Sequence, residues 1–213
     1  YYSFGSSAMA DRLERDMLTG RPFGGVAVLI SEKLRKMTSM VCCEERYIII
    51  RIGSTAIINV YLPCSGTDNR LSIIEDTLHD IEEKVKSLPF QSVIVGGDLN
   101  IDLSSNKHDA VKTVVLHFVN SLLLQRVDIL FDVRCPTFHH ETLNVCSQID
   151  YFLTSKPANV QEFETLSPDS NFSDHSPIMC VLYIPKDAGQ FSRENVNRKL
   201  ANITNKEYVT QLR

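Results

Sequence analysis

The stretch Ser92–Asn100, SVIVGGDLN, joins a short apolar run to two glycines and then to two polar side chains. Its β-branched residues predict a buried strand over 92–95, and the glycines after it allow the backbone to approach a neighbouring group closely. Asp98 and Asn100 stand two residues apart, so on an extended chain they point to the same side. A carboxylate and an amide in that arrangement could hold a water molecule or a metal ion and donate to a phosphate oxygen. The same residues are common in turns, so this stretch alone leaves both interpretations open.

Apolar runs elsewhere in the chain have the length and the bounding turn residues of further β-strands. Gly53-Ser54 is a hairpin-type turn between two of them. The run Val26–Ile30 is apolar at every position, which predicts a strand that is buried on both faces. The strands expected in this way cover 26–30, 46–52, 56–62, 92–95, 127–130, 148–153 and 178–184.

Two further segments have the pattern of helices. Asp68 or Asn69 can cap the first, which runs to about Leu88 and repeats its apolar residues at the spacings of an amphipathic helix, with its charges on a solvated face. A second helix is expected over about 108–124. This α/β order, with hairpins mixed among helices, fits two packed sheets with flanking helices better than a doubly wound parallel sheet. No Gly-x-Gly-x-x-Gly and no P-loop follows any of the expected strands.

The composition is that of one globular domain: 213 residues, of which 43% are hydrophobic and 23% charged. The formal net charge of −4 argues mildly against a large basic face for DNA, but it does not exclude a local cationic groove. The sequence shows no signal peptide and no apolar run long enough to span a membrane. Because the chain starts with Tyr1 rather than Met, a missing N-terminal segment is expected.

Six cysteines are present, and none of them forms a Cys-x-x-Cys pair. Buried free thiols are therefore expected, which favours an intracellular, reducing compartment, nuclear or cytoplasmic, over secretion. A zinc site is the alternative for four residues that lie near one another in the sequence, although their spacing matches no familiar pattern. These four are Cys135, His139, His140 and Cys146.

The segment Ser173–His175 lies shortly before the last apolar strand, again where a loop meets a sheet. Asp174 offers a hard oxygen ligand, and His175 offers an imidazole that titrates near neutral pH. An imidazole that acts as a general acid or base needs a partner to orient it. Asp150 is a candidate partner, because a carboxylate in the apolar strand over 148–153 would be costly to bury alone. A helix cap or a surface turn is the alternative for this Asp-His pair.

Three motifs stand at strand ends in a fixed order: Gly-Asp-Leu-Asn over 97–100, Ser-Gln-Ile-Asp-Tyr over 147–151 and Ser-Asp-His-Ser-Pro over 173–177. In this order they resemble the endonuclease/exonuclease/phosphatase family. That family has the fold of DNase I, a four-layered α/β sandwich in which two packed mixed β-sheets are flanked by helices. The resemblance covers about residues 20–185 and implies the same fold for this chain.

Three more segments make the resemblance closer to one branch of that family: GRPFGGVAVL at 20–29, NVYLP at 59–63 and PTF at 136–138. They resemble the apurinic-type endonuclease domain of non-LTR (LINE-type) retrotransposons, in which this domain precedes a reverse transcriptase. The resemblance implies one endonuclease domain over 1–185. The polar residues 186–213 would then be a linker toward a reverse transcriptase domain.

The resemblance also implies an activity. The chain would be a monomeric domain that nicks DNA by metal-dependent hydrolysis of a phosphodiester bond and so primes reverse transcription. Asp98 would orient or deprotonate the attacking water, and Asn100 would steady the nucleophile and the charge that develops on phosphorus. His175 would hydrogen-bond the scissile phosphate, with Asp150 fixing its ring.

The remaining implied roles concern the metal and the substrate. Asp174 would lie in the metal and water shell together with Asp98. Tyr61 would contact the phosphate, and Thr137 would lie beside the DNA. The cofactor would be Mg²⁺, with Mn²⁺ as the alternative, which neutralises the transition state and assists the leaving 3′ oxygen.

The chain departs from the family pattern in two places. Relatives supply an Asn and a metal-binding Glu from two earlier strands, whereas the sole Glu among the 24 residues before Gly25 is Glu14, in a charged segment. We therefore expect the first strands and the metal-binding Glu to be absent. Because Mg²⁺ depends on hard oxygen ligands, we expect little or no nuclease activity from these 213 residues alone. Cys64 stands where many relatives carry Asn, which leaves the local phosphate or base contact open.

Two other functions fit the same motifs. One is a same-fold phosphatase or phosphodiesterase acting on inositol phosphates or sphingomyelin, which the segments 20–25 and 61–63 disfavour. The other is a non-catalytic remnant that keeps the fold without turnover, although the candidate catalytic residues are all intact.

Overall fold

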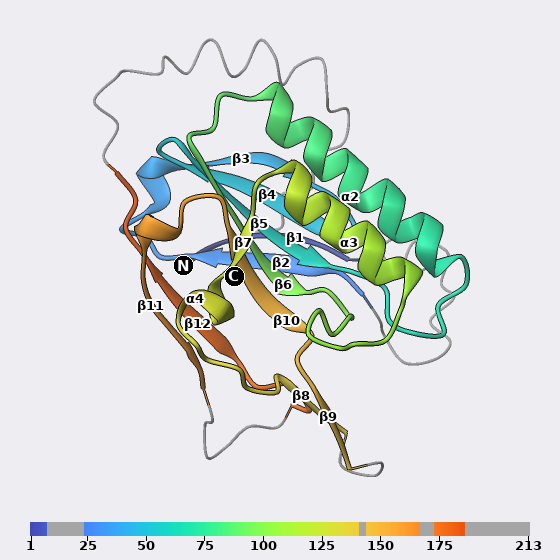
Figure 1. Ribbon diagram of the computed structural model, residues 1–213. Helices are drawn as coiled ribbons and strands as arrows, with labels where there is room; N and C mark the ends of the chain where they lie inside the picture. The colour runs from blue at the N-terminus through green and yellow to red at the C-terminus, as the bar shows by residue number, and fades with distance from the viewer. Residues whose placement is uncertain (8–23, 141–143, 167–172, 186–213) are drawn as a thin grey trace.

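A computed structural model describes residues 1–7, 24–140, 144–166 and 173–185 of the chain (Figure 1). It confirms the predicted mixed α/β class. The centre is a six-stranded sheet in the order β3-β4-β5-β6-β10-β7, in which β5 and β6 run parallel and the other neighbours antiparallel. Its strands are β3 Thr38–Cys43, β4 Tyr47–Ile52, β5 Thr55–Tyr61, β6 Ser92–Asp98, β7 Gln125–Arg126 and β10 Asp150–Thr154.

β4 and β5 form the predicted hairpin, which turns at Gly53-Ser54. Gly53 has a φ of 59°, in the left-handed region that glycine adopts without a steric penalty. Every residue of β4 is buried, because helices cover one face of the sheet and further strands cover the other. β6 continues beyond the predicted 92–95, through both glycines to Asp98. A buried strand therefore leads directly to the candidate site.

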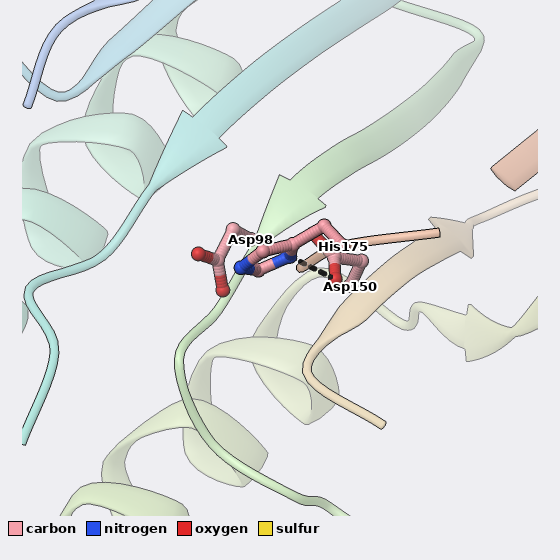
Figure 2. Close-up of side chains that lie close together, drawn as sticks. All are labelled: Asp98, Asp150 and His175. Atoms are coloured by element: carbon pink, nitrogen blue, oxygen red, sulfur yellow. Dashed lines mark hydrogen bonds and ion pairs between the residues drawn. The ribbon is translucent and has the colours of Figure 1, made fainter. Parts of the chain in front are cut away.

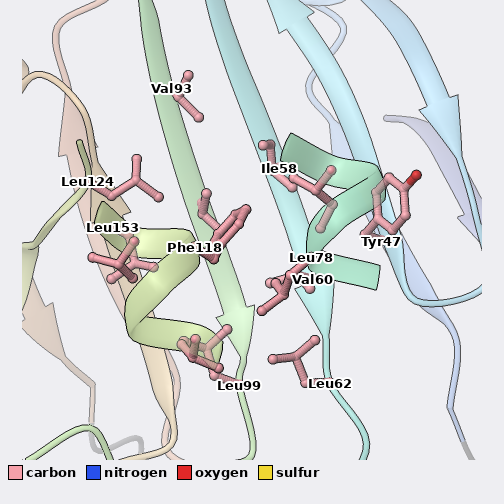
Figure 3. Close-up of a cluster of buried hydrophobic side chains, with 14 of the residues drawn as sticks. Tyr47, Ile58, Val60, Leu62, Leu78, Val93, Leu99, Phe118, Leu124 and Leu153 are labelled. Carbon is pink, nitrogen blue, oxygen red and sulfur yellow. The ribbon is translucent and has the colours of Figure 1, made fainter. Parts of the chain in front are cut away.

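Two helices cover one face of this sheet, α2 Arg70–Ser87 and α3 Ala110–Ser121 (Figure 1). α2 has the predicted spacing, but only the middle of its apolar stripe is buried, and Leu71 in the first turn is 37% exposed. Asp109 caps α3, because its side chain accepts a hydrogen bond from the Val111 N–H. The buried side chains of both helices meet those of the sheet in the main core, among them Val60, Leu78, Phe118 and Leu153 (Figure 3).

The opposite face of the sheet is covered by two strand pairs. β1 Tyr2–Ser6 pairs antiparallel with β2 Val26–Ile30, and β11 Val160–Thr165 pairs antiparallel with β12 Ile178–Leu182. β2 packs on the central sheet through its buried end residues, but Leu29 is 68% exposed. The prediction that this strand is buried on both faces is therefore wrong. Helices, central sheet and strand pairs stack as successive layers, as expected for the α/β sandwich.

The segment Val127–Leu130 is a short helix, α4, and the predicted strand there is wrong. The N–H of Phe131 donates to the Val127 carbonyl and closes a helical turn. Val127 and Asp128 are both buried, whereas a strand would direct these neighbours to opposite faces. Arg126 pairs with the Asp128 carboxylate at N–O distances of 2.5 and 3.2 Å, which makes that burial tolerable. The helical turn thus places the buried carboxylate of Asp128 where Arg126 can pair with it.

The remaining described elements are small. β8 Phe138–His140 and β9 Val145–Ser147 form a hairpin that projects from the body of the molecule (Figure 1). Two 3₁₀ helices, η1 Arg35–Met37 and η2 Pro157–Asn159, precede β3 and β11. No helix in the part of the chain that the structure describes is long and apolar enough to cross a membrane.

The cysteines correct a further prediction. All six are free thiols, but only Cys42 is buried, in β3 against the main core. Of the four residues considered for zinc, His139 and Cys146 face each other across the β8–β9 hairpin, with Nδ1 and Sγ 3.3 Å apart. Cys135 and Cys146 are exposed, and the four do not form a metal-ligating cluster of three or more among the described residues. Cys135 therefore lies on a loop and Cys146 on the projecting β8–β9 hairpin, outside the hydrophobic core.

Candidate active site

The two glycines that precede Asp98 in β6 lie so close to the neighbouring strands that a side chain would not fit at either position. A Cβ added to Gly97, whose φ is 139°, would lie 2.0 Å from the backbone oxygen of Val60 in β5. A Cβ added to Gly96 would lie 2.6 Å from the ring of Phe152 in β10. The close approach predicted for the two glycines is confirmed. It fixes Asp98, the next residue, where β5, β6 and β10 meet.

Asp98 and Asn100 are joined to each other and to the end of β5. The Asn100 backbone N–H donates to Asp98 Oδ1 at 2.8 Å, and Asn100 Nδ2 donates to Asp98 Oδ2 at 2.9 Å and to the Leu62 carbonyl at 2.8 Å. Both N–H groups of the Asn100 amide are thus engaged. Within the described residues, Oδ1 is the amide atom left to accept a further hydrogen bond. This arrangement suits an acceptor for water better than the phosphate donor that the sequence suggested.

A second carboxylate lies beside the first. Asp150 begins β10 and is the antiparallel register partner of Asp98. Burial raises the pKa of Asp98 to about 6, and the negative charge of Asp150 adds to the rise. The hydrogen bonds from Asn100 act in the opposite direction, because they favour the charged carboxylate. A carboxyl group with a pKa near 6 is suited to accept a proton close to neutral pH.

His175 completes the group and is held by Asp150. Its Nδ1 lies 2.9 Å from Asp150 Oδ2. Figure 2 marks this interaction with a dashed line. This hydrogen bond is the main cause that raises the pKa of His175, and burial opposes it. The backbone N–H of His175 donates to Ser173 Oγ at 3.1 Å, and the ring centroid lies 5.1 Å from that of Phe138. The carboxylate therefore fixes both the orientation and the tautomer of the imidazole.

Thr137 ties together the segments that carry Asp150 and His175. Its side chain is 1% exposed, and its Oγ1 accepts hydrogen bonds from the backbone N–H groups of Ile149 and Asp150 at 3.1 and 3.0 Å. Its carbonyl accepts from the Ser176 N–H at 2.7 Å. Thr137 thus supports the Asp150–His175 pair from behind. The DNA contact implied by the family resemblance stays a prediction.

Tyr61 and Asp174 lie at the margin of the group. Tyr61 ends β5 as the parallel register partner of Asp98, and burial raises the pKa of its hydroxyl, with Cys64 and Asp98 adding to the rise. This phenol stays protonated and can donate a hydrogen bond. Asp174 is exposed, and its backbone carbonyl accepts from the His139 N–H at 2.8 Å. The roles predicted for both stay predictions.

The site suits a divalent cation. In the described part of the chain, one ligand atom from each of Asp98, Asp150 and His175 lies within 4.8 Å of the others, and Asp174 is not in this group. Adjacent carboxylates repel each other, and this repulsion adds to the rise that burial causes in the pKa of Asp98. A cation that prefers oxygen ligands, such as Mg²⁺ or Mn²⁺, would relieve it. The group offers two carboxylates, which is few for a tight site.

Two supporting residues were missed from the sequence. The Tyr151 hydroxyl accepts from the Leu103 N–H at 3.0 Å, and Arg126 Nη2 donates to Ser104 Oγ at 2.9 Å. Both contacts anchor the loop that follows β6. Tyr151 carried a signal, because a tyrosine in a buried strand must find a partner for its hydroxyl. Arg126 carried none, because its partners are distant or depend on the turn of α4.

We expect Thr137→Val to destabilise the protein by about 1–3 kcal/mol, because two partly buried N–H groups lose their acceptor. Valine keeps the volume of the side chain, so the change isolates the hydroxyl. Chemical denaturation measures the difference. Thr137→Ser is the matched control, because it keeps the acceptor and should cost less. Equal stability of the two variants would contradict the assigned contact.

Ionisation of the Asp98 carboxyl should lower the free energy of unfolding as the pH rises from about 4 to about 6. Burial raises the pKa of its carboxyl from the ordinary 3.8 to about 6, so the native state binds more protons than the unfolded state over that range. The free energy of unfolding should fall by on the order of 2 kcal/mol across it. Denaturation of the wild type and of Asp98→Asn without divalent cations measures this contribution. Parallel pH curves for the two proteins would refute it.

Comparison with known proteins gives a family and a fold. The sequence model of a family described as "Endonuclease-reverse transcriptase" matches residues 55–179, more than half of the chain. This match includes the segments that carry Asp98, Asn100, Asp150 and His175. No curated protein matches the chain.

Solved structures similar to the chain include a phosphatase and two AP endonucleases. The 3′ phosphatase NExo from Neisseria, bound to a product DNA hairpin, has a TM-score of 0.55 at 14% identity, with 66% of each chain covered. An AP endonuclease from Archaeoglobus fulgidus has 0.52 at 17% identity, also with 66% of each chain covered. The AP endonuclease LMAP from Leishmania major has 0.50 at 16%, covering 67% of this chain and 56% of the other. The chain thus spans just under two thirds of the first two structures, and at these identities the likeness shows the fold.

Proposed function

The chain belongs to the endonuclease-reverse transcriptase family, and from this premise we propose that it is a divalent-metal-dependent phosphodiesterase that nicks DNA. One observation carries the proposal. Asp98, Asp150 and His175 come from three separate segments and meet within 4.8 Å at the end of a buried strand. A base, an imidazole and its orienting carboxylate are the groups that hydrolysis of a phosphodiester needs.

Asp98 and Asn100 handle the attacking water in this proposal. The water donates one hydrogen bond to Asp98 and one to Asn100 Oδ1, which leaves a lone pair for phosphorus. As the new P–O bond forms, the water proton passes to Asp98, and the bond to the 3′ oxygen breaks. The products are a 5′ phosphate and a 3′ hydroxyl, whose oxygen takes its proton from solvent. Burial raises the pKa of Asp98, which makes its carboxylate a stronger proton acceptor than an exposed one.

His175 and Tyr61 bind the phosphate in this proposal. With Nδ1 held by Asp150, the opposite ring nitrogen of His175 donates to a phosphate oxygen. Tyr61 donates its hydroxyl to another phosphate oxygen. A cation held by Asp98 and Asp150, Mg²⁺ or Mn²⁺, would supply positive charge against the anionic transition state.

The biological role follows the family. The 3′ hydroxyl left at the nick can prime DNA synthesis, which fits an endonuclease that acts together with a reverse transcriptase. We propose that residues 1–185 form the endonuclease domain and that 186–213, which lie outside the described residues, lead toward such a partner domain. The domain acts as a monomer in this proposal.

Nicking of supercoiled plasmid tests the proposal. We expect slow conversion to nicked circles in Mg²⁺ or Mn²⁺, and none with a chelator. The rate should be low, because the described cluster offers only two carboxylates to the cation. Phosphate release from soluble phosphoinositides is the parallel assay, and it should be absent. Phosphoinositide hydrolysis without nicking would contradict the proposed activity on DNA and would favour the same-fold phosphatase.

A further inference from the structure

Arg70, the first residue of α2, joins two loops that both lead into the candidate site. Its Nε donates to the Pro63 carbonyl at 2.9 Å, and its Nη2 donates to the Asn100 carbonyl at 2.7 Å. Pro63 follows Tyr61 by two residues, and Asn100 follows Asp98 by two. One half-buried guanidinium therefore spans the chain beyond the ends of β5 and β6.

Arg70 connects the two backbones at the point where the hydrogen-bonded pairing of β5 and β6 ends. β5 and β6 are parallel neighbours up to the pair Tyr61 and Asp98, and the Leu62 N–H still donates to the Asp98 carbonyl at 2.9 Å. Proline has no N–H to continue such a ladder. The planar fork of Arg70 supplies two donors at this point and bridges the two backbones. It thereby keeps the loops at the separation that the sheet sets.

Asn100 needs this support more than an ordinary loop residue does. Its φ of 52° lies in the left-handed region, which asparagine tolerates better than other residues with a Cβ but at a higher conformational cost than glycine. Arg70 binds its carbonyl, while its own amide binds Leu62 and Asp98. Without the guanidinium, the Asn100 carbonyl loses its charged donor, and the residue can relax away from Asp98.

The position of Arg70 in the helix does not account for it. A cation in the first turn of a helix is opposed by the helix dipole. Asn69 occupies the N-cap position, yet its side chain makes no capping hydrogen bond, contrary to the sequence prediction. The Asn69 side chain therefore does not cap the helix, and the charge of Arg70 does not favour its position. Arg70 instead donates hydrogen bonds to the carbonyls of Pro63 and Asn100, in the two loops that lead into the candidate site.

We propose that Arg70 is a positioning residue, which locks Asn100 and the Tyr61–Pro63 segment against each other and so sets the spacing between the water-binding and the phosphate-binding groups. It acts through these groups and does not touch the substrate. The inference rests on the proposed function, because the spacing matters only if the two loops serve one reaction.

Hydrogen exchange by mass spectrometry on the full chain tests the loops without requiring catalysis. In Arg70→Gln, exchange over 61–66 and 98–104 should rise about tenfold, while the core strands keep their protection. In Arg70→Lys, the charge stays but the planar fork is lost, so the rise should be smaller but still measurable. Arg35→Gln is the matched control, because Arg35 is an exposed arginine paired with Glu32 and should leave both loops unchanged.

Single-turnover nicking of plasmid at saturating protein is the second readout. The rate should fall on the order of tenfold to a hundredfold in Arg70→Gln, with little change in the protein concentration that half-saturates the rate. Unchanged loop exchange would overturn the inference, as would a uniform rise over the whole sheet, which would indicate lost global stability. Full wild-type behaviour of Arg70→Lys in both assays would assign the effect to charge alone and also overturn it. If the wild type does not nick DNA, the proposed function fails, and the exchange result alone decides on Arg70.

Discussion

Gly97→Ala should cost at least about 4 kcal/mol of folding free energy, a large fraction of the stability of an ordinary domain. The added Cβ would lie 2.0 Å from the Val60 backbone oxygen, and backbone atoms of a central strand cannot move aside as a side chain can. The φ of 139° adds conformational strain. β5 and β6 would have to separate where they position Tyr61 and Asp98. Thermal or chemical denaturation measures the loss.

Gly66→Ala is the matched control for this substitution. Gly66 also has a positive φ, 91°, but a Cβ added there would meet nothing within 4 Å. Its cost should therefore be the conformational strain alone, about 1–2 kcal/mol. The difference between the two variants isolates the contact with Val60. Similar losses in both would show that strand contact at Gly97 is not what requires glycine.

Asp150→Asn should slow DNA cleavage by about 10²–10⁴-fold, the usual contribution of a positioned acid–base group. The charge of Asp150 holds the His175 ring and raises its pKa, and asparagine removes that charge at nearly constant shape. The same charge contributes to the raised pKa of Asp98. Single-turnover nicking between pH 5 and pH 9 measures both effects.

The pH profile gives this variant a signature beyond lost activity. In the wild type, the rate should rise with pH as Asp98 loses its proton, over a range that burial of the carboxyl moves to higher pH and the bound cation moves to lower pH. In Asp150→Asn, this rise should move to lower pH, because a neighbouring negative charge no longer favours the protonated form. Glu162→Gln, an exposed carboxylate on β11, is the control and should leave the profile unchanged. A rise at the same pH in both variants would contradict the coupling of the two carboxylates.

The local signals in the sequence indicated most of the residues that the structure brings together in the candidate site. Two glycines before Asp98 indicated a close backbone approach, and an aspartate in an apolar strand indicated that Asp150 needs a partner. Both features depend on the residues next to them, so they are legible from one chain. His175 and Asp150 do lie together, with Nδ1 and Oδ2 2.9 Å apart.

What the sequence could not show depends on pairing between distant segments. The register that places Asp150 beside Asp98 arises from how β10 meets β6, and a shift of one residue would turn Asp150 to the other face. The contacts of Thr137 and Arg70 are with backbone atoms of other segments. The pattern of side chains in the sequence does not indicate such contacts. Short apolar runs were the other weakness, since Val127–Leu130 suits a helical turn as well as a strand.

The proposed function depends on Asp98 as the base of a DNA-cleaving site. Single-turnover nicking of supercoiled plasmid by the wild type and by Asp98→Ala, in Mn²⁺ near pH 7.5, tests it most directly. The wild type should nick at least about a hundredfold faster than the variant, even if its own rate is low. Equal rates for the two proteins, whether fast or absent, would contradict the claim.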